Sequence, residues 1–98
     1  MDCYIILDDY GGATVRVIDY THSLGVIIDF NIEEETVKKL FDAINKNIDF
    51  KISNYNFKLS PSSKTITFGS DIKIDGVDYD DCITSFLDDY RKMKSVAK

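Results

Sequence analysis

The fold is decided by residues 4–30, which read YIILDDYGGATVRVIDYTHSLGVIIDF. The apolar run Tyr4–Leu7 predicts a strand buried on both faces. Residues 8–12 predict a tight hairpin turn, because paired glycines supply the positive φ that such turns require. Residues 14–20 alternate apolar and polar side chains, and residues 26–30 are a third apolar run. Three neighbouring strands with short connections predict an antiparallel meander.

A helix is expected directly after this meander. Asn31 is a favourable N-cap with Glu34 three residues later, and acids fill the first turn, where the helix dipole favours negative charge. The residues that follow place apolar side chains at helical spacing: Val37, Leu40, Phe41, Ile44 and Ile48. The pattern therefore predicts a helix that begins at Asn31.

The second half of the chain predicts further strands. Residues 50–52 and 55–59 have opposite strand parities, so a bulge or tight bend is expected between them, with the ring of Tyr55 directed into the core. After a proline turn, residues 65–74 alternate again. Gly69, followed by a serine, either kinks this strand or divides it in two.

Asp78 is expected to cap a second helix with one apolar stripe, which consists of Tyr79, Cys82, Ile83, Phe86, Leu87, Tyr90 and Met93. The element order βββ-α-ββ(β)-α then defines an α+β class. We expect an antiparallel sheet of five or six strands with the two helices packed on one face. A chain of 98 residues forms a single domain, residues 1–98.

The composition indicates in which cellular compartment the protein is expected. No apolar stretch approaches the roughly 20 residues that span a bilayer, and no basic region precedes the first apolar run, so neither a membrane span nor a signal peptide is expected. The two cysteines, Cys3 and Cys82, are far apart in sequence, which favours a reduced, cytoplasmic setting. A single Cys3–Cys82 disulfide is the open alternative.

Catalytic and metal-binding patterns are weak. The one histidine, His22, stands beside Ser23, and adjacent side chains align poorly for proton transfer. Residues 71–82 resemble a calcium loop, but Lys73 and Cys82 occupy positions that require ligand oxygens. We therefore expect no enzyme activity, no metal site and no cofactor.

The chain carries a net charge of −5 that is unevenly distributed. Residues 1–35 hold eight acids and one Arg, whereas residues 36–70 hold two acids and six Lys. The last third contains a cluster of acids: Asp71, Asp75, Asp78, Asp80, Asp81, Asp88 and Asp89. Asp8 and Asp9 in the first turn could extend it.

This acidic cluster has a functional and a structural interpretation. On a helix, Asp81 and Asp88 lie about 10.5 Å apart along one face, and three nucleotides of a single strand advance by roughly the same distance. Such a row of carboxylates can imitate a phosphate backbone and dock into the basic, nucleic-acid-binding groove of a partner protein. Alternatively, the acids only cap a helix, fill turns and keep the protein soluble.

Two further binding modes stay open. Lys51, Lys58 and Lys64 surround the second hairpin, and basic side chains near an aromatic residue can follow single-stranded nucleic acid. The net negative charge opposes this mode. A free sheet edge can also join the chain to a partner or to a second copy of itself, as in a structural or assembly module.

In general style, the chain resembles small phage-encoded inhibitors, including anti-CRISPR proteins and other DNA mimics. The shared features are a length of about a hundred residues, abundant Asp, Tyr, Ile and Lys, scarce Pro and a pI near 4.6. This resemblance is compositional and matches no motif. It implies a protein that blocks a nucleic-acid-binding machine by occupying its basic cleft.

Overall fold

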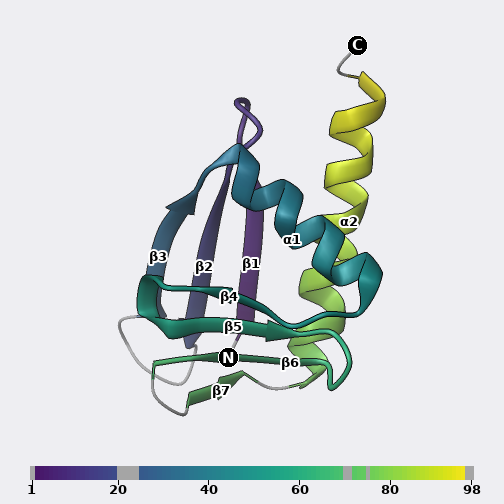
Figure 1. Ribbon diagram of the computed structural model, residues 1–98. Helices are drawn as coiled ribbons and strands as arrows, with labels where there is room; N and C mark the ends of the chain where they lie inside the picture. Colours follow the sequence, from purple (N-terminus) through teal and green to yellow (C-terminus); the bar gives the residue numbers. More distant parts are fainter. Residues whose placement is uncertain (1, 20–24, 70–71, 75, 97–98) are drawn as a thin grey trace.

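The computed structural model describes residues 2–19, 25–69, 72–74 and 76–96, which form two antiparallel sheets and two α-helices (Figure 1). The first sheet has the order β1 (Asp2–Leu7), β2 (Ala13–Asp19), β3 (Gly25–Ile32). The second has the order β4 (Phe50–Ile52), β5 (Phe57–Ser60), β6 (Thr65–Phe68), β7 (Ile72–Ile74). The helices are α1 (Glu34–Lys46) and α2 (Gly76–Val96).

The α+β class is confirmed, but the expectation of one sheet of five or six strands is wrong. After β3, α1 crosses in front of the first sheet and delivers β4 over that sheet's face instead of beside one of its edges (Figure 1). The strands β4–β7 therefore pair among themselves. The two sheets share one hydrophobic core, in which the ring of Phe30 on β3 meets the edge of Phe57 on β5 at 6.0 Å.

The first sheet has one buried and one exposed face. Cys3 and Ile5 on β1 point into the core, as do their register partners Val17 and Val15 on β2. The prediction that β1 is buried on both faces is wrong, because Tyr4 and Ile6 keep 40% and 46% of their surface exposed. The alternation of side chains along a strand accounts for the difference, since burial of one parity directs the other outward.

The first helix begins later than its sequence signal predicts. Asn31 belongs to β3, where its side-chain oxygen accepts a 2.8 Å hydrogen bond from the Thr14 hydroxyl on β2. Glu33 is the N-cap, and the helix ends at Lys46, before the left-handed Asn47. The cross-strand pairing outcompetes the local capping pattern.

The second helix bears out its predicted apolar stripe. Most of these side chains are buried, and Leu87 and Met93 are partly buried against the core. The helix begins at Gly76, so Asp78 lies within its first turn and is not the cap. Tyr90 stacks on Phe41 of α1 with ring centroids 4.3 Å apart, which holds the two helices together.

A short 3₁₀ turn, Asn54–Asn56, separates β4 from β5. The predicted change of strand parity occurs at this turn. Tyr55 and Asn56 adopt positive φ there. The Tyr55 ring stacks on Phe30 at 5.5 Å but stays 53% exposed, so the expectation that it points into the core is wrong. Gly69, with φ of 65°, divides the following segment into β6 and β7.

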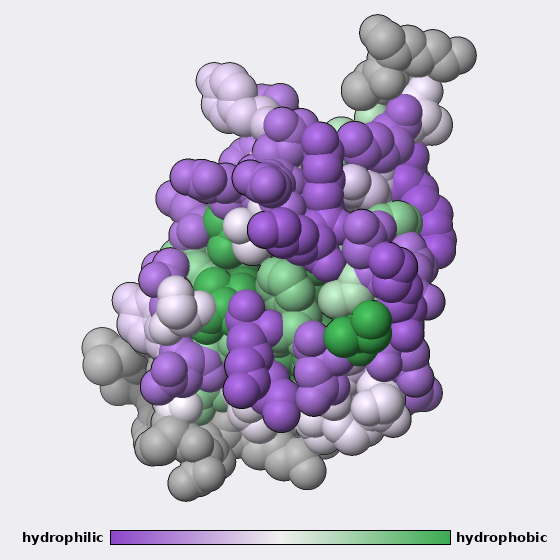
Figure 2. Space-filling view, in the orientation of Figure 1, coloured by the Kyte–Doolittle hydropathy of each residue, from purple (hydrophilic) through white to green (hydrophobic). Residues whose placement is uncertain are grey.

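The core is not fully closed on the face that carries α1. Figure 2 shows apolar side chains between α1 and the strands β4 and β5, framed by hydrophilic ones. Ile48, which follows α1, is the most exposed aliphatic residue described, at 54%. The predicted helical stripe is therefore right for Val37 and Leu40 but ends before Ile48.

Phe86 is fully buried on α2. Replacing it with alanine leaves a cavity in a core that both sheets and both helices share, so Phe86→Ala should lower the free energy of unfolding by about 3–5 kcal/mol. Urea denaturation monitored by circular dichroism measures this loss. Thr84→Ala, at an exposed position of the same helix, is the matched control and should change stability by less than about 1 kcal/mol.

Candidate functional site

The predicted acidic cluster is only partly assembled in the structure. Asp80, Asp81, Asp88 and Asp89 are all exposed on α2. Asp80 pairs with Lys64 at 3.6 Å, and both side chains are largely exposed, so solvent screens this ion pair strongly. Asp71, Asp75 and the side chain of Asp78 lie outside the described part of the chain.

The two acids of the first hairpin, Asp8 and Asp9, lie apart from the acids of α2. Asp8 uses one carboxylate oxygen to accept hydrogen bonds from the backbone N–H groups of Tyr10 and Gly12, at 2.8 and 3.0 Å. This carboxylate therefore stabilises the turn. Asp9 is exposed beside it. The hairpin projects from the end of the first sheet opposite to the start of α2 (Figure 1).

A groove of about 270 Å³ lies between β1 and α2. We call it the acidic groove, and it is lined by Asp2, Cys3, Tyr4, Ile5 and Ile6 from β1 and by Asp81, Cys82, Ser85 and Asp89 from α2. The strand and the helix run in the same direction, from the lower end of the molecule in Figure 1 to the upper end. The groove therefore follows most of β1 and the part of α2 from Asp81 to Asp89.

Negative charge in the acidic groove is not neutralised locally. Among the residues that the structure describes, no basic side chain lies within 4.0 Å of the carboxylates of Asp2, Asp81 or Asp89. Arg16 on β2 is the register partner of Tyr4, but Asp29 holds its guanidinium at 2.9 Å. The exposed Asp81 and Asp89 and the half-buried Asp2 thus line one groove together with exposed apolar side chains.

Sequence reasoning found two of these carboxylates and missed the third. Asp81 and Asp89 belong to the predicted cluster, whereas Asp2 does not. Asp2, Tyr4 and Ile6 share one strand parity, so reading β1 as a strand with one exposed face would have found them. Cys3 and Cys82 are both buried at the groove and are not joined by a disulfide.

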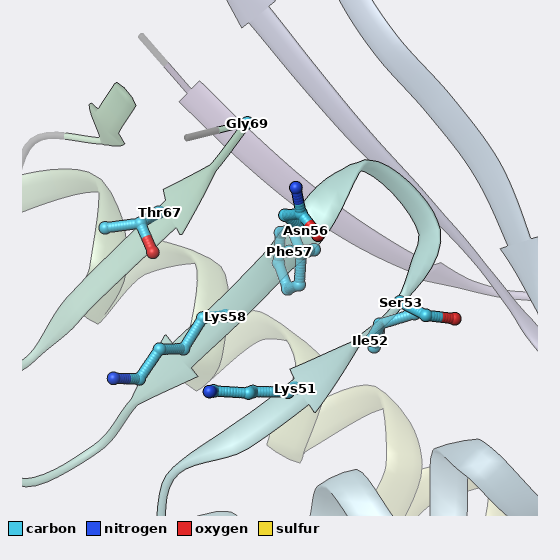
Figure 3. A pocket seen from close by; sticks show the side chains of 8 residues that line it. All are labelled: Lys51, Ile52, Ser53, Asn56, Phe57, Lys58, Thr67 and Gly69. Carbon is cyan, nitrogen blue, oxygen red and sulfur yellow. The ribbon is translucent and has the colours of Figure 1, made fainter. Parts of the chain in front are cut away.

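A second hollow, of about 600 Å³, lies on the outer face of the second sheet. We call it the basic hollow, and it is lined by Lys51, Ile52, Ser53, Asn56, Phe57, Lys58, Thr67 and Gly69. Figure 3 shows the Lys51 and Lys58 side chains extending to the same side from adjacent strands. The structure thus brings together two of the three predicted lysines, while Lys64 lies with Asp80 instead.

Asp49 borders this pair of lysines. Its carboxylate accepts a 2.7 Å hydrogen bond from the Ser60 hydroxyl and lies 3.4 Å from the Lys58 ammonium. The hydrogen bond from Ser60 is the largest cause that lowers the pKa of Asp49 below its ordinary value of 3.8, and Lys58 and the charge of Lys51 contribute in the same direction. The negative form of Asp49 is therefore favoured in the folded chain.

A lowered pKa makes the ionised form of Asp49 stabilising at pH values above 3.8. This contribution is lost as the pH falls through the lowered pKa of the folded state. In urea denaturation, wild type should therefore exceed Asp49→Asn in stability at neutral pH, and the difference should shrink below pH about 4. A difference that stays constant from neutral pH to pH about 3 would contradict this assignment.

Other kinds of site find little support in the described part of the chain. No group of three or more His, Cys, Asp or Glu side chains there is arranged to hold a metal ion. Neither described helix has an apolar stretch that would cross a membrane. His22 and Ser23 lie outside the described residues. Comparisons with protein-family models, curated proteins and solved structures found no match.

Proposed function

We propose that this chain is a non-catalytic protein-binding domain that receives a basic surface of a partner protein along the acidic groove. The observation that carries the proposal is the placement of Asp2, Asp81 and Asp89 around one groove without a neighbouring cation among the described residues. Like-signed charges gathered in a concave surface focus the electrostatic field and attract an oppositely charged partner.

The apolar lining supports a protein partner. Tyr4 and Ile6 are exposed beside the carboxylates, although large apolar side chains are more stable when buried. Aromatic and aliphatic side chains at the centre of an interface supply most of its binding energy, whereas charges at the rim set the rate of association and the specificity. A partner that presents both basic and apolar side chains would satisfy both parts of the groove.

The partner surface that we favour is one that otherwise binds nucleic acid. Carboxylates in a row can take the place of phosphates in such a surface, and the negative charge and low pI of the chain agree with that role. Of the seven acids in the predicted cluster, Asp81 and Asp89 line the groove, and Asp88 is exposed on the same helix. The proposed inhibitor therefore acts through α2 and β1.

Assembly through a sheet edge is the second candidate. β3 is one of the two edge strands of the first sheet and has eight residues. An unpaired edge of this length can add a strand from a partner or from a second copy of the chain. Size-exclusion chromatography over a range of concentrations separates the two candidates, since only self-assembly makes the elution volume depend on concentration.

Charge reversal in the groove tests the leading proposal. The immobilised wild-type chain should retain a partner from bacterial lysate at low salt and release it at high salt, because salt screens exposed charges. Asp81→Lys combined with Asp89→Lys should lower retention at least about tenfold, since the groove then repels a basic surface. The retained protein should also lose its nucleic acid when the wild-type chain is added.

The matched control reverses two exposed acids away from the groove. Glu33→Lys with Asp42→Lys changes the net charge by the same amount and should retain the partner as wild type does. Circular dichroism verifies that both variants are folded. Retention that is insensitive to salt, or equal losses in both double variants, would rule out recognition by the acidic groove.

A further inference from the structure

The basic hollow has the properties of an anion site. Lys51 and Lys58 are direct register partners on β4 and β5. Two like charges opposite each other on one face of a sheet destabilise the pairing. Asp49 offsets this repulsion only in part, because it forms an ion pair with Lys58 and not with Lys51. An anion held between both ammonium groups would remove the repulsion.

The remaining lining groups favour an oxyanion with several acceptor oxygens. Ser53 and Thr67 provide hydroxyl groups, and Asn56 provides a side-chain amide. Within the described part of the chain these three side chains form no hydrogen bond with another residue, so their donors are available. Among the described residues that line the hollow there is no carboxylate. Phosphate matches such a set, because its oxygens accept several charge-assisted hydrogen bonds at once.

The wall of the hollow is preorganised. Tyr55 and Asn56 hold left-handed backbone conformations with φ of 58° and 49°. The Gly69 N–H donates a 2.7 Å hydrogen bond to the Tyr55 carbonyl, which ties the turn between β4 and β5 to the end of β6. Asn56 and Gly69, which lie at the same end of the hollow in Figure 3, are thereby fixed relative to each other. A fixed wall lowers the entropic cost of binding.

We propose that the basic hollow binds the phosphate group of a nucleotide, either free or in a single strand. Lys51 and Lys58 contact the phosphate oxygens, and the Thr67 hydroxyl, which lies on the Lys58 side in Figure 3, donates a further hydrogen bond. The volume of about 600 Å³ lies within the range of small-ligand sites, so it accommodates more than an isolated phosphate ion. This site does not depend on the acidic groove, with which it shares no residue.

Nuclear magnetic resonance titrations of the full chain test this proposal with three probes, namely inorganic pyrophosphate, ADP and a short oligothymidylate. Binding should shift backbone amide signals mainly in residues 51–58 and 67–69. Lys51→Gln combined with Lys58→Gln should weaken binding at least about tenfold, because two charge-assisted contacts are lost. Asp49→Asn should strengthen binding, since a competing carboxylate charge is removed.

Lys38→Gln with Lys39→Gln is the matched control, because it removes two exposed lysines from α1 and should leave the affinity unchanged. Preferential binding of ADP supports a nucleotide site, and preferential binding of the oligothymidylate supports a single-strand site. Equal binding of pyrophosphate supports a site that reads the phosphate alone and overturns its assignment to nucleotides. No binding of any probe, or the same affinity in the Lys51 and Lys58 double variant, overturns the proposal.

Discussion

The burial of one face of the β1–β3 sheet is the constraint on which the rest of the structure depends. Because side chains alternate along a strand, burial of Cys3 and Ile5 directs Tyr4 and Ile6 to the outside. The inner face needs a cover, which α1, α2 and the second sheet supply together in one core. Once the apolar stripe of α2 faces that core, the flank of α2 that carries Asp81 lies next to β1, and the acidic groove follows from this packing.

The division into two sheets also separates the charges of the chain. The acids of the first third lie mainly in and around the first sheet, and the lysines of residues 36–70 lie in α1 and the second sheet. At physiological salt the screening length is about 8 Å, so separate surfaces keep separate potentials. The fold therefore allows one small chain to present two surfaces of unlike charge, which are the two that we propose as binding sites.

Local patterns in the sequence were sufficient where local forces decide the structure. The alternation of residues 14–20 and the helical spacing around Phe86 gave the correct elements. Local patterns failed where distant residues compete, as at Asn31, whose capping signal is strong but whose side chain pairs with Thr14 across the sheet. The separation into two sheets is a similar case. A short sequence pattern can predict that β4 is a strand, but it does not determine whether β4 lies beside the first sheet or over its face.

The same reasoning explains which part of the candidate site could be predicted. Asp81 and Asp89 follow from the helical period of a single segment, so their shared flank is visible in the sequence. Asp2 joins them only because β1 and α2, at opposite ends of the chain, pack together. Its contribution is a tertiary property.

The composition of the groove decides what kind of binding it can support. Exposed carboxylates accelerate encounter with a basic partner, but their attraction in water is weak and salt reduces it further. Tyr4 and Ile6 add apolar area that becomes buried only when a partner covers the groove. Charge alone would give a fast and short-lived encounter, whereas the combination can retain the partner. In the proposed function, the strand β1 therefore matters as much as the acidic helix for turning an encounter into a complex.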